Sequence, residues 1–294
     1  MEYRTLGKTG LRVSVVGIET HQWSGMGGKT FSQDDIGRYI GRAEELGFNF
    51  VDTGECYRNH ASERLIGGAL QGKRERFVVA TKFGHIGNIE DRVADWSFAS
   101  IMASLDASLA ALRTDYIDIF QAHLFDSRDS ADFLENRNGI CRALAAARAA
   151  GKIRAAGISL GDNELIEGAV EILKLAIEVF GVETAQVAYS RLHNEAEESV
   201  IPLARVSNLG LIARAPLAKG YLSTRFKPAK DYDAELLQRA RGIIRAEVPA
   251  GVDSAEWAIA WCVRDPAIGV VVPGCSAIEQ LDSTVRAAEV VRFL

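Results

Sequence analysis

The chain has 294 residues, of which 48% are hydrophobic and 25% charged, so it is long and apolar enough to bury a large core as one domain over residues 1–294. Its net charge of -5 gives no electrostatic reason to expect nucleic acid or an anionic membrane as a partner. No uninterrupted apolar span reaches membrane length, and the first residues lack the apolar segment of a secretory signal, which predicts a cytoplasmic location. The cysteines are scattered without metal-ligand spacing, so we expect free thiols and no metal site.

The beginning of the chain predicts a hairpin followed by a strand. Residues 3–14 place polar and apolar residues around a glycine-containing turn, and residues 15–20 form a mostly apolar run of strand length. The glycine-rich stretch after this run contains Gly28-Lys29-Thr30, which matches the end of a phosphate-binding loop. Trp23 stands where that motif needs its first glycine, so we exclude a P-loop here.

From residue 32 onward, strand-like and helix-like segments alternate. Ser32 is a candidate N-cap for a helix whose apolar residues recur at helical spacing up to Gly47. Further helices are predicted at 98–112, in the Ala-rich stretch before Gly151, at 165–180, at 200–206 and after Ser254 as an N-cap. Strands are predicted at 48–52, 77–81, 116–122, 153–159, 185–189, 211–215 and 269–272. About eight alternations without a break in composition predict one parallel (β/α)8 barrel. Residues 224–250 are polar and basic, with helical character in 234–245.

Polar side chains follow three of the predicted strands. One run ends at Asp52 and continues through a glycine turn to Tyr57, the next ends at Lys82, and a third ends at His123. Because the carboxyl ends of barrel strands meet at one mouth, we predict that these four residues form a site. Each alone has a structural explanation, as packing, an ion pair or a satisfied polar group. Four such placements around one mouth favour catalysis.

The segments that carry these residues, "VDTGECY", "VVATKFG" and "DYIDIFQAH", resemble the aldo-keto reductases, whose catalytic Asp, Tyr, Lys and His occur in this order. The resemblance extends from "YRTLGKTGLRVSVVGIET" to "VVVPGCSAIEQL", and "PLAKGYLS" is most similar to the bacterial and potassium-channel-β-like branch. It implies a TIM barrel whose bottom is closed by the N-terminal β-hairpin. It also implies an oxidoreductase that interconverts a carbonyl (aldehyde, ketone or keto-sugar) and an alcohol, with NADP(H) favoured over NAD(H).

The resemblance implies a role for each of the four residues. Carbonyl reduction needs a hydride at carbon, from the nicotinamide, and a proton at oxygen, from the protein. Tyr57 is the expected proton donor and acceptor, although a phenol has an ordinary pKa of ~10. Lys82 supplies a cation that favours the phenolate, and Asp52 holds Lys82 in place. His123 hydrogen-bonds the carbonyl oxygen or helps to relay the proton.

The resemblance places the cofactor across the barrel mouth, and no G-x-G-x-x-G follows the first strand to indicate a Rossmann domain instead. The implied cofactor contacts are Thr20, Ser159, Gln186, Arg214, Leu217, Gly220, Leu222, Arg225, Gly274, Ser276 and Gln280. The candidate substrate walls are Trp23, Phe83, Trp96 and Phe125. Packing in loops and at strand ends is the structural alternative for every residue of both sets.

Two departures from the family pattern fall near the expected nicotinamide. Glu19 occupies a position usually given to glycine, and Arg214 stands where many relatives have an aromatic residue. An unpaired buried carboxylate is costly, so we predict that Glu19 pairs with Arg214. The alternative is that Glu19 binds a hydroxyl or amine of a polar substrate.

Two other functions are compatible with the same residues. A regulatory subunit can retain the barrel and the cofactor as a sensor with slow turnover. A sugar lyase or epimerase can use Tyr57 to abstract a proton without net redox chemistry. The intact set of four residues favours the reductase, acting on a small-molecule carbonyl or alcohol, whereas the substrate's identity and the oligomeric state are not readable from the sequence.

Overall fold

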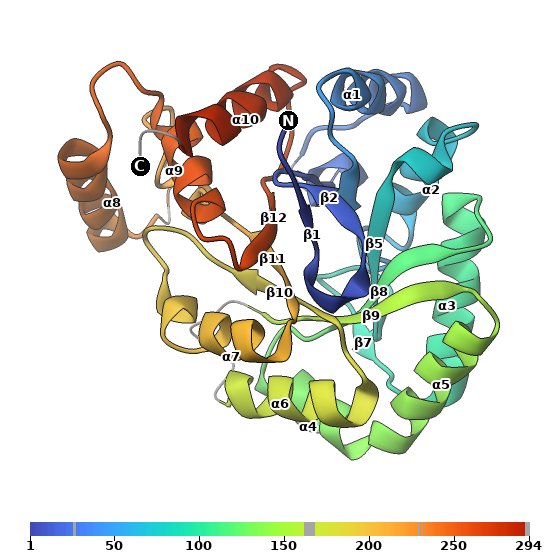
Figure 1. Ribbon diagram of the computed structural model, residues 1–294. Coiled ribbons are helices and arrows are strands. Elements are labelled where there is room, and N and C mark those ends of the chain that lie inside the picture. The colour runs from blue at the N-terminus through green and yellow to red at the C-terminus, as the bar shows by residue number, and fades with distance from the viewer. Residues whose placement is uncertain (26–27, 162–167, 229, 231, 292–294) are drawn as a thin grey trace.

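The computed structural model describes residues 1–25, 28–161, 168–228, 230 and 232–291, and its centre is a nearly closed barrel of parallel strands (Figure 1). In barrel order the strands are β3 (Ile18–Glu19), β4 (Phe50–Asp52), β5 (Val78–Phe83), β8 (Ile117–His123), β9 (Ile153–Ser159), β10 (Thr184–Ala188), β11 (Gly210–Arg214) and β12 (Ile268–Val272). Bridges from Val16 to Val271 and from Glu19 to Gly274 join the first and last strands. The predicted (β/α)8 barrel is therefore confirmed.

Helices surround the strands, as Figure 1 shows. They are α1 (Gln33–Glu45), α2 (Ala61–Ala69), α3 (Phe98–Leu112), α4 (Ser127–Glu135), α5 (Arg137–Ala149), α6 (Ala169–Phe180), α7 (Val200–Ser207), α8 (Ala234–Glu247), α9 (Ser254–Val263) and α10 (Glu279–Val290). Helix α1 begins with the expected cap, because Ser32 accepts from the amide of Asp35 and the Asp35 side chain accepts from the amide of Ser32. Residues 165–167 of one predicted helix lie outside the described residues. No described helix combines the length and apolarity needed to cross a bilayer.

The N-terminal hairpin caps one end of the barrel. Strands β1 (Tyr3–Thr5) and β2 (Arg12–Ser14) pair antiparallel and lie across the front of the barrel in Figure 1. Leu6, at the turn, is fully buried in a cluster with side chains from the barrel strands. Gly210 and Gly269 permit this contact, since a Cβ atom on either residue would come within 2.7 Å of a Leu6 carbon atom. The hairpin thus closes the end opposite the mouth, as predicted.

The structure corrects two local predictions. The first barrel strand is shorter than 15–20, because the residues before β3 bond individually, Val15 to the carbonyl of Glu2 and Gly17 to that of Val271. The N-cap of α9 is Asp253, which accepts from two backbone amides, whereas Ser254 is the first helical residue. The helical character predicted within the polar stretch 224–250 is confirmed by α8, which lies outside α9 in Figure 1. Two short strands, β6 (His85–Ile86) and β7 (Val93–Ala94), also follow β5 at the mouth.

Candidate active site

Lys82 is the centre of the proposed site. It lies in β5, and its ammonium donates to Asp52 Oδ2 at 2.6 Å, to the carbonyl of Thr53 at 2.7 Å and to Tyr57 Oη at 3.1 Å. The side chains of Lys82 and Asp52 are 1% and 0% exposed. An ammonium has three donor hydrogens and no acceptor, so these three oxygens satisfy it completely. The structure thus brings Asp52, Tyr57 and Lys82 together.

Tyr57 keeps its proton in this environment. Burial, then the negative charges of Glu19 and Asp52, raise its pKa well above 10. The expected net shift toward phenolate is therefore not found, because burial and the nearby negative charges outweigh the positive charge of Arg214, which lowers the pKa. Since Lys82 donates to the phenol oxygen, the phenol hydrogen of Tyr57 remains available for another acceptor.

The backbone after Tyr57 turns sharply toward α2. Arg58, Asn59 and His60 all have positive φ angles, 51°, 47° and 64°. A left-handed residue other than glycine costs roughly 1–2 kcal/mol, so the surrounding contacts must hold this turn. The amide of His60 donates to the carbonyl of Glu55 at 2.7 Å, and the amide of Tyr57 donates to that of Gly54 at 3.1 Å. The turn thereby fixes the place from which the Tyr57 side chain reaches Lys82.

His123, the last residue of β8, carries a neutral imidazole. Burial, then the positive charge of Lys82, lowers its pKa well below the usual value. Its Nδ1 atom lies 3.6 Å from Cys56 Sγ, and burial raises the pKa of that thiol to about 12. Because Cys56 stays protonated, it can donate to Nδ1 and leave the proton of the ring on Nε2. The sequence did not reveal this contact between Cys56 and His123.

Ser159, the last residue of β9, lies beside Gln186 in the middle of β10. They are register partners, and the hydroxyl of Ser159 donates to Gln186 Oε1 at 3.1 Å. Gln186 is buried, yet its Nε2 atom has no hydrogen-bond partner among the described residues. Buried amide donors are normally paired, so this one fits a ligand carbonyl such as that of a nicotinamide carboxamide. The hydroxyl hydrogen of Thr20 is already used within the protein, since it is donated to the carbonyl of Asp52 at 2.9 Å.

Arg214, the last residue of β11, donates to the carbonyl of Leu160 at 3.1 Å. Leu217 and Gly220 belong to one tight turn, in which the amide of Gly220 donates to the carbonyl of Leu217 at 2.9 Å. Leu222 is fully buried in the main core, which favours packing over a cofactor contact.

Arg225 is 78% exposed and pairs with Asp253 at 2.8 Å. Gln280 in the first turn of α10 accepts from the amide of Ser276 at 2.8 Å. Gly274, where the chain leaves β12, bridges to Glu19 in β3. Apart from Leu222, which is buried in the core, the predicted cofactor positions therefore follow the edge of the mouth from β9 to β12 and β3.

The candidate substrate walls differ in their surroundings. Trp23 is 1% exposed, donates from Nε1 to the carbonyl of Cys275 at 2.8 Å and packs edge-on against Tyr39, which favours a core role. Phe83 and Trp96 are also buried and pack edge-on against each other. Phe125 alone of the four is partly exposed, and its ring lies 4.1 Å from that of His123. Phe125 therefore has the best placement for a substrate contact.

His21 was missed by the sequence analysis. Its ring lies edge-on to Tyr57, with 5.1 Å between centroids, and it is partly exposed. Burial, then the charge of Lys82, lowers its pKa, so the imidazole is neutral at physiological pH. The position of His21 directly after the first predicted strand could have identified it as a site residue, because strand ends line the mouth.

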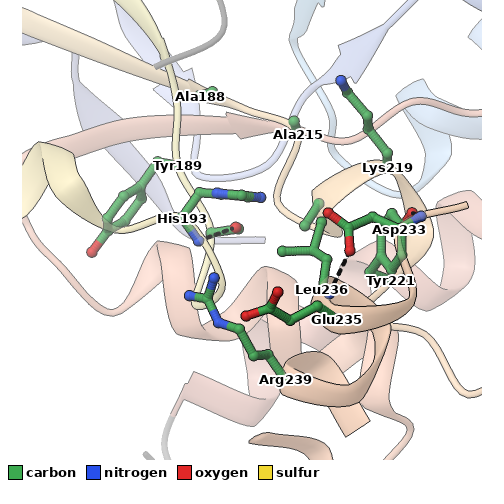
Figure 2. Close-up of a pocket in the computed structure, with 12 residues that line it drawn as sticks. Ala188, Tyr189, His193, Ala215, Lys219, Tyr221, Asp233, Glu235, Leu236 and Arg239 are labelled. Atoms are coloured by element: carbon green, nitrogen blue, oxygen red, sulfur yellow. Dashed lines mark hydrogen bonds between the residues drawn. The ribbon is translucent and has the colours of Figure 1, made fainter. Parts of the chain in front are cut away.

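A cavity of about 350 Å³ lies beside the predicted cofactor segment (Figure 2). It is bordered by Ala188 at the end of β10, by Ala215 after β11 and by α8. His193, Glu235 and Arg239 lie around this space in Figure 2. None of the four predicted catalytic residues lines it, so this cavity is not the reaction centre.

Comparisons with known proteins agree with this fold. The model of the "Aldo/keto reductase family" matches residues 17–293. An uncharacterized oxidoreductase of Bacillus subtilis, YrpG, is 31% identical over 99% of this chain and 92% of its own length. L-galactose dehydrogenase of Arabidopsis thaliana is 28% identical over 98% of this chain and 88% of its own length. The holo form of aldo-keto reductase AKR11C1 from Bacillus halodurans superposes with a TM-score of 0.82 and 27% identity, covering 98% of this chain and 91% of that one.

Proposed function

Since this protein belongs to the aldo/keto reductase family, we propose that it is an NADP(H)-dependent oxidoreductase interconverting an aldehyde, ketone or keto-sugar and an alcohol, with Tyr57 as proton donor and acceptor. The observation that carries the proposal is the fully satisfied ammonium of Lys82, held between the carboxylate of Asp52 and the phenol of Tyr57. A buried ion pair that also holds a phenol by its oxygen is an arrangement suited to proton transfer.

Each residue has a distinct task in the proposed reaction. A nicotinamide, when bound, supplies the hydride in reduction and takes it in oxidation. Tyr57 gives its proton to the substrate oxygen, and Lys82 stabilises the phenolate that forms. Asp52 pairs with Lys82 and fixes its orientation. His123, neutral and held at Nδ1 by Cys56, donates from Nε2 to the same oxygen.

Ser159 and Gln186 are the proposed holders of the nicotinamide carboxamide, because Gln186 offers a buried donor without a partner among the residues that the structure describes. Arg225, with Ser276 and Gln280, is proposed to favour NADP(H), since an additional ribose phosphate needs cationic or hydrogen-bonding partners. The similarity to a galactose dehydrogenase supports sugars as one substrate class.

Replacement of Tyr57 by Phe tests the proposal. We expect turnover of aldehydes and keto-sugars with NADPH to fall by roughly 10²–10⁴-fold, because only the proton donor is removed. Binding of NADPH, followed by its fluorescence, should be unchanged. Tyr39→Phe is the matched control, because Tyr39 is a buried tyrosine of α1 that packs on Trp23 in the core. Wild-type turnover by Tyr57→Phe would refute the assigned role.

A further inference from the structure

Glu19 is a second carboxylate at the mouth of the barrel, and the proposed proton transfer does not use it. We propose that Glu19 stabilises the positive charge that develops on the nicotinamide ring as hydride leaves it, so that the site binds the oxidised cofactor in preference to the reduced one and promotes carbonyl reduction. This inference rests on the proposed function. It makes Glu19 a specificity-determining residue for the redox state of the cofactor.

The fold aims Glu19 at the same space as Asp52. The two residues are register partners on the neighbouring parallel strands β3 and β4, so their side chains point to the same face. Glu19 Oε1 accepts from the amide of His21 at 2.6 Å. Glu19 Oε2 lies 3.5 Å from the position that a Cβ atom on Gly274 would occupy. The carboxylate is therefore fixed between the first strand of the barrel and the segment after the last.

The ring must lie close to this carboxylate. The carbon that receives the hydride carries the oxygen that Tyr57 protonates, and reacting atoms approach to about 3–3.5 Å. Glu19 is near enough to Tyr57 that its charge is the largest contribution after burial to the raised pKa of the phenol. The unpaired amide of Gln186 and the bridge between Glu19 and Gly274 both lie at predicted cofactor positions. A ring on this path, within reach of Tyr57, lies in the field of Glu19.

The predicted Glu19–Arg214 contact is replaced by other hydrogen bonds. Glu19 accepts from the amide of His21, and Arg214 donates to the carbonyl of Leu160. Arg214 still acts at longer range, since its charge lowers the pKa of Glu19. Glu19 and Arg214 therefore interact through longer-range electrostatics, and they do not form the predicted close ion pair.

The charges around Glu19 make its ionisation responsive to the cofactor. Burial, then the charge of Asp52, raises the pKa of Glu19 to about 7, while Lys82 and Arg214 act in the opposite direction. Tyr57 and His21, which also face Glu19, are neutral at physiological pH. Ionised Glu19 therefore adds one negative charge at the mouth, and protonation of Glu19 removes it.

The negative charge of Glu19 affects the cofactor through the charge that the nicotinamide ring gains in hydride transfer. In reduction, a hydride leaves the reduced nicotinamide and adds to the carbonyl carbon, and the proton of Tyr57 goes to the oxygen. The ring loses two electrons with the hydride and becomes a cation. A nearby carboxylate lowers the energy of that cation relative to the neutral reduced ring. The same carboxylate strengthens binding of NADP⁺ and leaves binding of NADPH almost unchanged.

The experiment compares dissociation constants for NADP⁺ and NADPH by calorimetry and fluorescence, at pH 6.0, 7.0 and 8.5, in the wild type and in Glu19→Gln. At pH 8.5 we expect the ratio of the NADP⁺ to the NADPH dissociation constant to be roughly ten-fold higher in Glu19→Gln, since a unit charge at this range is worth about that factor. In the wild type the ratio should rise as the pH falls through about 7, because the carboxyl group takes up a proton. In Glu19→Gln it should not change with pH.

Glu55→Gln is the matched control. Burial also raises the pKa of Glu55 to about 7, but its carboxylate accepts from the amide of His85 at 2.8 Å and from the hydroxyl of Ser104. This variant should keep the wild-type ratio and its pH dependence. Equal losses of both affinities, or an unchanged ratio, in Glu19→Gln would overturn the inference. If the wild type binds neither cofactor, the proposed function itself fails, and the two failures are thereby distinguished.

Discussion

Removing Lys82 should reduce stability and activity through different interactions. In Lys82→Met, the buried carboxylate of Asp52 loses its ammonium partner and keeps a hydrogen bond from Gln121 Nε2 at 3.3 Å. An uncompensated buried charge costs about 3–5 kcal/mol, so the free energy of unfolding should fall by that amount. Urea unfolding at pH 7, followed by circular dichroism, measures the loss.

The double variant Asp52→Asn/Lys82→Met separates the two effects. It contains no unpaired charge, so most of the lost stability should return. Turnover should remain low, because no cation is left beside Tyr57 to stabilise the phenolate. Lys152→Met is the matched control, since Lys152 and Asp106 form an exposed pair worth about 0–1 kcal/mol. A Lys82→Met variant as stable as the Lys152→Met control, or a double variant with wild-type turnover, would refute this account.

Two further variants test positions around the mouth. Cys56→Ala should lower kcat by about 3- to 10-fold without changing NADPH affinity, because a weak hydrogen bond of roughly 0.5–1.5 kcal/mol to His123 is lost. Cys56→Ser keeps a hydrogen-bond donor and should retain more of the activity. Equal losses of kcat in both variants would argue against this contact. Arg225→Ala should weaken NADPH binding more than NADH binding, because its exposed guanidinium needs only to exchange Asp253 for the ribose phosphate. Titrations that show equal losses for both cofactors would remove Arg225 from the phosphate site.

The barrel and the grouping of Asp52, Tyr57, Lys82 and His123 could be predicted from the sequence alone. Alternating helical and strand patterns specify a parallel sheet, and the carboxyl ends of its strands meet at one edge. Residues that follow successive strands must then lie near one another, whatever the loops between them contain. The N-terminal hairpin was predicted for a similar local reason, a glycine turn between two short alternating segments.

Tertiary structure alone decided the contacts inside this frame. The carbonyl of Thr53 is the third acceptor for Lys82, and His123 at the end of β8 contacts Cys56 in the segment after β4. Trp23 follows the first barrel strand in the sequence, but its side chain is buried in the core, whereas the ring of His21 packs against Tyr57. A sequence pattern specifies which strand end a residue follows, but the register and stagger of the closed barrel determine which atoms come within hydrogen-bond distance. The proton affinity of each group then depends on burial and on the sum of nearby charges, which exist only in the assembled mouth.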